Sequence, residues 1–202
     1  MAVDNKKLTG IMIHGFAVAH AGTAFALAQT VVGDTAALTG LTIAMIVSIS
    51  MVNGANWNIS KGFAFLGVYA GTYFGTMGAV TLIKWIPGLG NVANAAVSFT
   101  LTEVMGWATY LIIKQSSDPK NIDPKSLSKE EIKKIMEIAK GMQKAETEEM
   151  KRLYDSMEPE EKAEFGSIMK QLKNRELPEE TRKYLIGRIE TISSKYAKGS
   201  EA

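Results

Sequence analysis

Three residues in the apolar part of the chain have side chains that could do chemistry: Glu103, His14 and His20. Glu103 is the only acidic residue inside a predicted membrane span. A carboxylate near a bilayer centre costs about 2.5–3.5 kcal/mol on insertion scales, so it usually faces a partner or a watery cavity. Glu103 is therefore interpreted either as a proton or cation relay or as a hydrogen-bonded strut between helices, beside Thr100 and Thr102. We favour the strut.

The two histidines do not predict a metal site. On one helix, six residues of separation place the rings about 120° apart around the axis and about 9 Å apart along it. Two such side chains cannot chelate one ion, and two histidines alone make a poor site. The chain also has no cysteine and no His-x-x-x-His or Glu-x-x-His pair. We predict no metal site and no cofactor.

The usual catalytic motifs are missing from the sequence. There is no Gly-x-x-x-x-Gly-Lys-Ser/Thr loop for nucleotide phosphates, no Gly-x-Ser-x-Gly elbow and, without cysteine, no Cys–His pair. The net charge is +2, and no stretch concentrates enough Lys and Arg to neutralise a phosphate track. We predict no catalytic residues, no enzymatic activity and no nucleic-acid partner.

Four apolar segments occupy the first half of the chain, and none alternates with period two, so helices are expected. A bilayer core of about 30 Å needs roughly 20 helical residues, which three of the segments reach and the second only approaches. We favour membrane insertion, although a tightly packed soluble bundle could have the same Ala- and Gly-rich composition. The segments run from about 8 to 32, 36 to 52, 62 to 84 and 91 to 113.

Charge divides the chain into two parts. Of 23 basic and 21 acidic residues, residues 1–115 hold only Lys6, Lys7, Lys61, Lys84, Lys114, Asp4, Asp34 and Glu103. We predict an apolar membrane domain over 1–115, a linker over 116–127 and a charged helical domain over 128–202. The excess of lysine on one side of four spans places both termini in the cytoplasm by the positive-inside rule. Trp57 and Trp85 flank the spans and are expected at the headgroup level.

The charged part predicts three amphipathic helices. Ser128 and Glu131 form a capping box ahead of an apolar stripe that continues to Met157. Pro159 and Pro178, each followed by two glutamates, mark two further helix starts. A bundle this small has a thin core, so we expect it to dock on the apolar half or on another subunit. The fold is thus expected to be all-α: a four-helix, glycine- and alanine-rich transmembrane bundle followed by a small charged three-helix bundle.

Glycines recur at helical spacing in the third apolar segment, at Gly67, Gly71, Gly75 and Gly78. They form a groove without side chains, of the kind by which helices associate in lipid. The groove is interpreted as a packing face within the chain or as a face for self-association. The first segment has a similar ridge of small residues that includes Gly15 and Gly22. After the third segment, Pro87 ends the helix, and Gly88 and Gly90 permit the positive φ of a tight hairpin turn.

Two blocks of sequence carry a resemblance to a known family. One contains Asp34, Leu38-Thr39, Leu41 and Met45-Ile46 ahead of Gly54; the other runs from Ile86 to Ala96, with Thr102-x-x-x-Gly106 after it. In order and spacing, residues 34–113 resemble the helical domain of unknown function that accompanies Era-like and dynamin-like GTPase domains in bacteria. The family often has Gln in place of Thr42. The resemblance implies a membrane-associated, GTPase-linked role and no active site.

Together these observations predict a non-enzymatic protein of the cytoplasmic membrane. Its expected partners are membrane lipid, further copies of itself and a GTPase from another chain, beside which it anchors or remodels membrane. A second hypothesis is a soluble oligomeric assembly that buries its apolar helices or lipid-like ligands. A third, a channel or transporter, rests on Glu103, His14 and His20 alone.

Overall fold

The computed structural model describes residues 4–27, 35–84 and 91–198, and it describes side chains outside 25–27, 35–36, 73–84 and 91–94. Its elements are helical, as the sequence predicts. In chain order they are α1 (Asn5–Leu27), α2 (Thr35–Val52), α3 (Ile59–Lys84), α4 (Asn91–Gln115), the short 3₁₀ helices η1 (Pro119–Asn121) and η2 (Pro124–Ser126), α5 (Lys129–Asp155), α6 (Pro159–Leu172) and α7 (Glu179–Ala197).

Several helices begin where side chains can satisfy their free backbone N–H groups. Asp4 accepts from the backbone of Lys6 at 2.8 Å, and Asn58 accepts from that of Lys61 at 3.0 Å. Ser128 and Glu131 form the predicted capping box. Proline at the first turn of α6 and at the cap of α7 confirms the two starts expected in the charged half.

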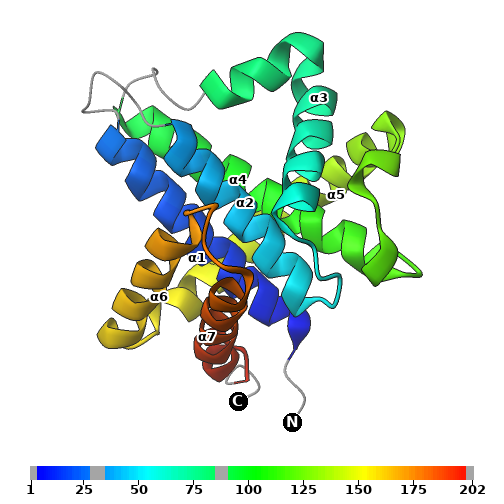
Figure 1. The fold of residues 1–202 in the computed structure, drawn as a ribbon. Helices are drawn as coiled ribbons and strands as arrows, with labels where there is room; N and C mark the ends of the chain where they lie inside the picture. Colours follow the sequence, from blue (N-terminus) through cyan, green and yellow to red (C-terminus); the bar gives the residue numbers. More distant parts are fainter. Residues whose placement is uncertain (1–3, 28–34, 85–90, 199–202) are drawn as a thin grey trace.

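Helix α1 lies at the centre of the molecule, in contact with α2, α4, α5, α6 and α7 (Figure 1). Its neighbours α2 and α4 run antiparallel to it. Asn53 at the end of α2 donates to Thr9 near the start of α1, and His20 near the end of α1 contacts Leu38 near the start of α2. The C-terminal end of α1 and the N-terminal ends of α2 and α4 therefore lie at the same end of the molecule.

The charged half packs directly on α1, as its amphipathic helices predicted. A Cβ at Gly10 would lie 2.3 Å from Met150 of α5, and one at Gly15 would lie 2.4 Å from Phe165 of α6. One hydrophobic core joins residues from both halves. The predicted linker over 116–127 thus connects helices that share one core. The change in composition there does not separate two independently packed bundles of four and three helices.

Burial follows the apolar stripes of the charged helices. The buried positions include Ile132, Ile135, Met136, Ala139 and Met150 in α5, Phe165, Ile168, Met169 and Leu172 in α6, and Leu185, Ile189 and Ile192 in α7. The expected position of Trp57 at the headgroup level was wrong: its side chain is only 1% exposed, because the loop after α2 turns its ring onto Phe65. Tyr184 is 67% exposed because it lies one position outside the stripe of α7.

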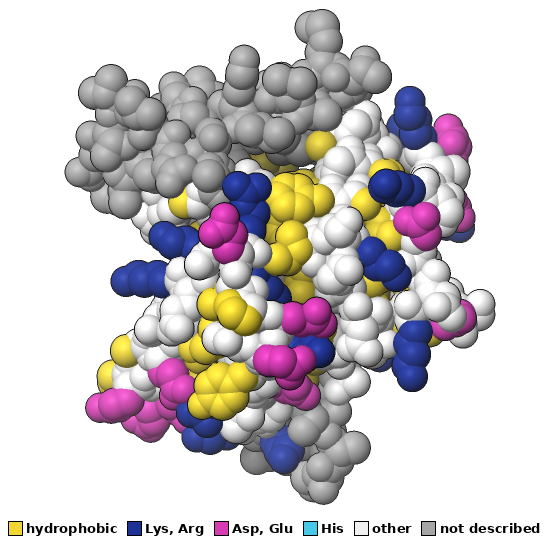
Figure 2. All heavy atoms as spheres, viewed as in Figure 1, with side chains coloured by type: hydrophobic (Ala, Val, Ile, Leu, Met, Phe, Trp, Pro, Cys, Tyr) yellow, Lys and Arg dark blue, Asp and Glu magenta, His cyan; other side chains and the backbone are white. Residues whose placement is uncertain are grey.

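The described surface mixes charges of both signs. Figure 2 shows Lys, Arg, Asp and Glu side chains interspersed over one face, with apolar side chains between them. Large apolar side chains with substantial exposure include Phe63 in α3, Val97 in α4 and Ile138 in α5. Isolated exposed apolar residues are ordinary on a protein surface, so these three side chains do not by themselves indicate a binding site. Phe63 and Val97 lie on the apolar helices α3 and α4, whereas Ile138 lies on the charged helix α5.

Candidate functional site

Glu103 and His14, two of the three candidate residues, meet in the core between α4 and α1. The Oε1 atom of Glu103 lies 2.9 Å from Nδ1 of His14. Glu103 is 1% exposed and His14 is 3% exposed, so the pair is removed from water. Because an unpaired charge in such a place is strongly destabilising, each group depends on the other.

Helix α5 closes the other side of the Glu103 carboxylate. The Oε2 atom of Glu103 accepts from Nε2 of Gln143 at 3.1 Å. It also lies 2.5 Å from the hydroxyl oxygen of Thr147, whose single proton serves both Glu103 and the backbone carbonyl oxygen of Gln143 at 2.6 Å. Sequence analysis placed Thr100 and Thr102 beside Glu103, but Thr102 instead donates to the backbone of Ser98. We call His14, Glu103, Gln143 and Thr147 the buried polar cluster; His14 and Glu103 are buried, whereas Gln143 and Thr147 are half-buried.

The sequence of α5 does contain a signal for the two partners of Glu103, which is a pair of polar residues within an apolar stripe. Positions 136, 139, 143, 147 and 150 follow helical spacing along one face of α5, and three of them are buried apolar residues. Gln143 and Thr147 are the two polar residues in that stripe. A polar side chain inside a packing stripe indicates a buried polar partner on a neighbouring helix, which here is Glu103.

Aromatic rings surround the His14 imidazole. The ring of Phe99 in α4 lies edge-on to it at 5.2 Å between centroids, and that of Tyr154 in α5 lies at 5.7 Å. Tyr154 also packs on Phe165. Burial is the main reason that the pKa of Tyr154 is raised above its usual value, and the neighbouring Asp155 adds to the shift. The cluster is therefore enclosed by apolar surface as well as by hydrogen bonds.

His20, the third candidate, belongs to a separate arrangement between α1 and α2. Its Nδ1 lies 3.0 Å from the carbonyl oxygen of Phe16, and its Nε2 lies 3.0 Å from Oγ1 of Thr42. The Nε2 atom also lies 3.2 Å from the carbonyl oxygen of Leu38, to which the Thr42 hydroxyl donates, and burial is the main reason that the pKa of His20 is lowered. The structure thus brings Glu103 to His14 and leaves His20 with partners of its own.

The buried polar cluster is suited to holding helices together. Its carboxylate accepts hydrogen bonds from side chains of two other helices, which matches the strut interpretation of Glu103. Within the described residues, no group of three or more His, Asp or Glu side chains is arranged to hold a metal ion. The arrangement at this site is thus a set of hydrogen bonds between side chains of three helices.

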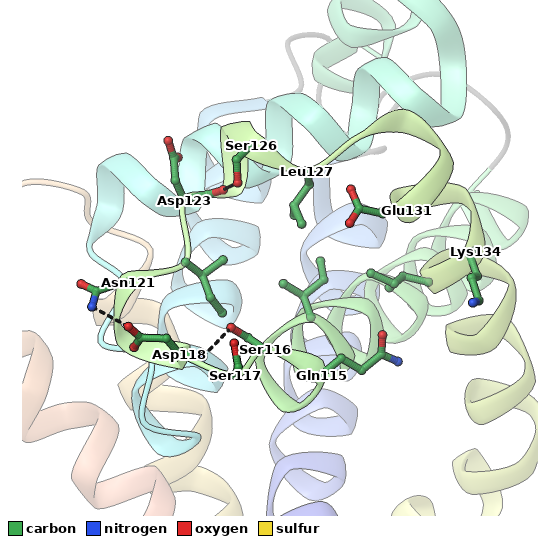
Figure 3. Close-up of a pocket in the computed structure, with 13 residues that line it drawn as sticks. Gln115, Ser116, Ser117, Asp118, Asn121, Asp123, Ser126, Leu127, Glu131 and Lys134 are labelled. Atoms are coloured by element: carbon green, nitrogen blue, oxygen red, sulfur yellow. Dashed lines mark hydrogen bonds between the residues drawn. The ribbon is translucent and has the colours of Figure 1, made fainter.

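A second feature is a pocket of about 560 Å³ between the end of α4, the segment over 116–127 and the start of α5 (Figure 3). Its acidic side chains are already engaged locally. Asp118 accepts from Asn121, Asp123 accepts from the backbone of Lys125, and Glu131 completes the capping box. The acidic side chains are therefore occupied within the pocket wall, which also contains Gln115, Ser117 and Lys134.

The glycines divide into two kinds. Gly10, Gly15, Gly40 and Gly106 are sites of close approach, where an added Cβ would lie 2.3–2.7 Å from a neighbouring atom. Gly67 and Gly71 would meet nothing within 4 Å among the described residues. The surroundings of Gly75 and Gly78, and the turn at Pro87, Gly88 and Gly90, lie outside what the structure describes.

One helix in the described residues is long and apolar enough to cross a membrane, the stretch Ala95–Gln115 of α4. In the structure 56% of the tested window is buried inside the protein. A buried core helix of a soluble protein has the same length and composition, so this stretch alone is weak evidence for membrane insertion. It contains Glu103.

Comparisons with known proteins found no relative. No family model, no curated protein and no solved structure matches the chain.

Proposed function

We propose that this chain is a non-enzymatic, membrane-associated helical protein that self-associates and anchors or remodels the cytoplasmic membrane beside a partner such as a GTPase. The observation that carries the proposal is the separation of charge along the molecule. Between Leu8 and Ser60 the only charged residue is Asp34, and between Gly62 and Thr102 it is Lys84. The remaining charges belong to the N-terminus, to the region from Lys114 onward, and to Lys61 and the buried Glu103.

The fold gathers the ends of several largely uncharged helices together, and the end of α6 reaches them at Lys173, whose backbone lies against Gly40 of α2. The end of α1 and the beginnings of α2 and α4 lie at one end of the molecule, whereas α5 packs beside the N-terminal half of α1 (Figure 1). Val97 of α4, close to this end, is 44% exposed. Contact of the uncharged end with lipid would leave the charged helices in water, on the cytoplasmic side by the positive-inside rule.

A pair of matched variants tests this orientation. Val97→Glu places a charge on exposed α4, and Ile138→Glu places one on α5, where the wild-type side chain is similarly exposed at 40%. Because a charge in the hydrocarbon region costs about 2.5–3.5 kcal/mol, we expect Val97→Glu to lower binding to phosphatidylethanolamine–phosphatidylglycerol vesicles by at least roughly tenfold. Ile138→Glu should bind as wild type does. Equal binding by both variants, or no binding by the wild-type chain, would overturn the proposal.

A soluble assembly is the second candidate, and one observation favours it. Helix α1 is covered by α4 to α7, and more than half of the tested window in α4 is buried. Such burial is what a water-soluble helical protein needs. Cell fractionation separates the two candidates. Retention in the membrane pellet after carbonate supports membrane association, whereas release by salt supports the soluble assembly.

The GTPase partner rests on the resemblance of residues 34–113 alone. Cross-linking in cells, followed by purification of the chain, tests it. Recovery of a GTP-binding protein supports this part of the proposal. Its absence would remove the GTPase partner and leave the membrane role standing.

A further inference from the structure

We infer that the buried polar cluster is a latch: it holds α5 against α1 and α4, and release of α5 is the step that allows the stretch Ala95–Gln115 to enter a bilayer. The inference rests on the proposed membrane association and adds how that association is controlled. It concerns the one helix in the described residues with the length and composition of a span.

In the closed fold α4 cannot be surrounded by lipid. Val104, Met105, Trp107 and Ala108 are each 6% exposed or less, and α1 and α5 are among the helices that pack on α4. The outer face of α5 carries exposed lysines, including Lys133, Lys144 and Lys151. These charges would be costly in hydrocarbon, so α5 cannot accompany α4 into a membrane. Insertion of α4 therefore requires α5 to leave, and it requires the largely uncharged α1 and α2 either to separate from α4 or to enter the bilayer with it.

A short part of α5 makes the polar contacts that hold it in place. Gln143 and Thr147 donate to Glu103, Glu146 pairs with Lys6 of α1 at 2.6 Å, and Met150 lies against Gly10. Polar contacts of this kind differ from apolar packing because their groups regain hydration when they separate. An apolar core of the same shape is often at least as stable as a buried ion pair. We therefore infer that the polar cluster makes the contact of α5 with α1 and α4 specific and also allows that contact to open.

The connection between α4 and α5 is built as a hinge. Helix α4 ends at Gln115 and α5 begins at Lys129, and only two single-turn 3₁₀ helices lie between them. The pocket of about 560 Å³ lies under this segment and is bounded by Ile112 and Ile135 (Figure 3). The segment packs on the core through the buried Ile122 and Pro124, while most of its other residues are exposed. We therefore infer that α5 swings away from α4 by release of these contacts, without unfolding either helix.

Because the chain contains no cysteine, an engineered pair of cysteines can form one defined disulfide between α1 and α5. A Cβ at Gly10 lies 3.0 Å from Cγ of Met150, which is one bond from the Cβ of that residue. The two Cβ atoms are thus within reach of the separation of about 3.5–4.5 Å that a disulfide needs. In the double variant Gly10→Cys with Met150→Cys, the methionine that crowds position 10 is also removed. Oxidation ties α5 to α1, and reduction frees it.

The experiment compares carbonate-resistant association with phosphatidylethanolamine–phosphatidylglycerol vesicles before and after reduction. We expect the oxidised double variant to lose this association by at least roughly tenfold and to regain it on reduction. Equal association in both states would overturn the latch and leave the proposed membrane role intact. If neither the wild-type chain nor the reduced variant associates, both the membrane role and the latch are overturned.

A second variant keeps the test independent of the disulfide. Thr147→Val removes the hydroxyl that donates to Glu103 with little change of shape. Thr191→Val is the matched control, because Thr191 is exposed on α7 and bonds only within its own helix. We expect Thr147→Val to speed both amide hydrogen exchange in α5 and carbonate-resistant association by roughly tenfold, since a hydrogen bond to a charged group is lost. Rates unchanged from wild type, or equal to those of Thr191→Val, would overturn the assignment of the cluster as the latch.

Discussion

Gly15 of α1 lies so close to Phe165 of α6 that a Cβ at position 15 would stand 2.4 Å from Cε1 of the ring and 3.2 Å from Tyr154. Phe165 is fully buried, so its ring has no room to retreat. The apolar half of the chain and one of its charged helices are thus interlocked at a position where only glycine fits. This contact, together with the one at Gly10, makes the two halves of the sequence a single packed unit.

Substitution of Gly15 by Ala should therefore destabilise the fold. Overpacking of a filled core costs about 1–3 kcal/mol, which exceeds the gain of up to about 1 kcal/mol in helix propensity. Gly22→Ala in the same helix is the matched control, because nothing lies within 4 Å of its Cβ. We expect the control to be neutral or slightly stabilising. Urea unfolding measures both variants, and a Gly15→Ala protein as stable as wild type would contradict the interlocking.

Arg182 stabilises the end of α6 from a buried position in α7. Its guanidinium donates to the carbonyl oxygens of Leu172 at 3.1 Å and Asn174 at 2.9 Å, and burial lowers its pKa. Arg182→Met leaves those carbonyls without donors, so we expect a loss of about 2 kcal/mol in the free energy of unfolding.

Arg188→Met is the control for this effect. Arg188 pairs with Glu164 at the surface, where both side chains are about 40% exposed, so its loss should cost clearly less than the loss of Arg182. Urea unfolding of both variants separates the two roles. Equal losses would show that Arg182 acts as an ordinary surface charge.

The helices could be predicted from the sequence more fully than their packing. Caps at Ser128 and prolines at 159 and 178 mark helix starts through local chemistry, and the structure confirms these starts. Helix α1 is apolar on every side, so its sequence contains no polar face to show which neighbours cover it. The packing of α5, α6 and α7 on α1 depends on contacts between residues far apart in the sequence, so local sequence patterns do not predict it.

The candidate site could be predicted only in part, because its residues are also brought together by contacts between distant parts of the sequence. Glu103 could be singled out because it is an isolated acid in an apolar segment. Its pairing with His14 and Thr147 joins positions 89 and 44 residues away in the sequence. No local spacing encodes such a contact, although the polar interruption of the stripe in α5 indicates that a partner exists.

Tyr154 predicts a loss of stability in alkaline solution. Its pKa in the folded protein is raised above the usual 10.0, chiefly by burial. The folded state therefore holds this proton longer than the unfolded chain does, and its contribution is complete below pH 10. As the pH rises above about 10, stability should fall by up to about 1.4 kcal/mol per pH unit from this group.

Urea midpoints measured from pH 8 to pH 11 test this slope. Tyr154→Phe should flatten the alkaline fall, because the ring contacts with His14 and Phe165 remain and the titrating hydroxyl is gone. Tyr184→Phe is the control, since that side chain is 67% exposed. An alkaline slope unaffected by Tyr154→Phe would assign the loss to other groups.

Gly67 distinguishes packing within one chain from association between chains. It is exposed on α3, and an added Cβ meets nothing within 4 Å among the described residues. Gly67→Leu should therefore leave the folding of a single chain unharmed and gain up to about 1 kcal/mol in helix propensity. If a second copy packs on this face, the leucine blocks the close approach of the two helices and shifts the assembly toward smaller species.

Gly141→Leu, at an equally open glycine of α5, is the matched control. Cross-linking and blue-native electrophoresis read the assembly state, and an unchanged state in Gly67→Leu would remove the glycine face of α3 from the self-association proposal.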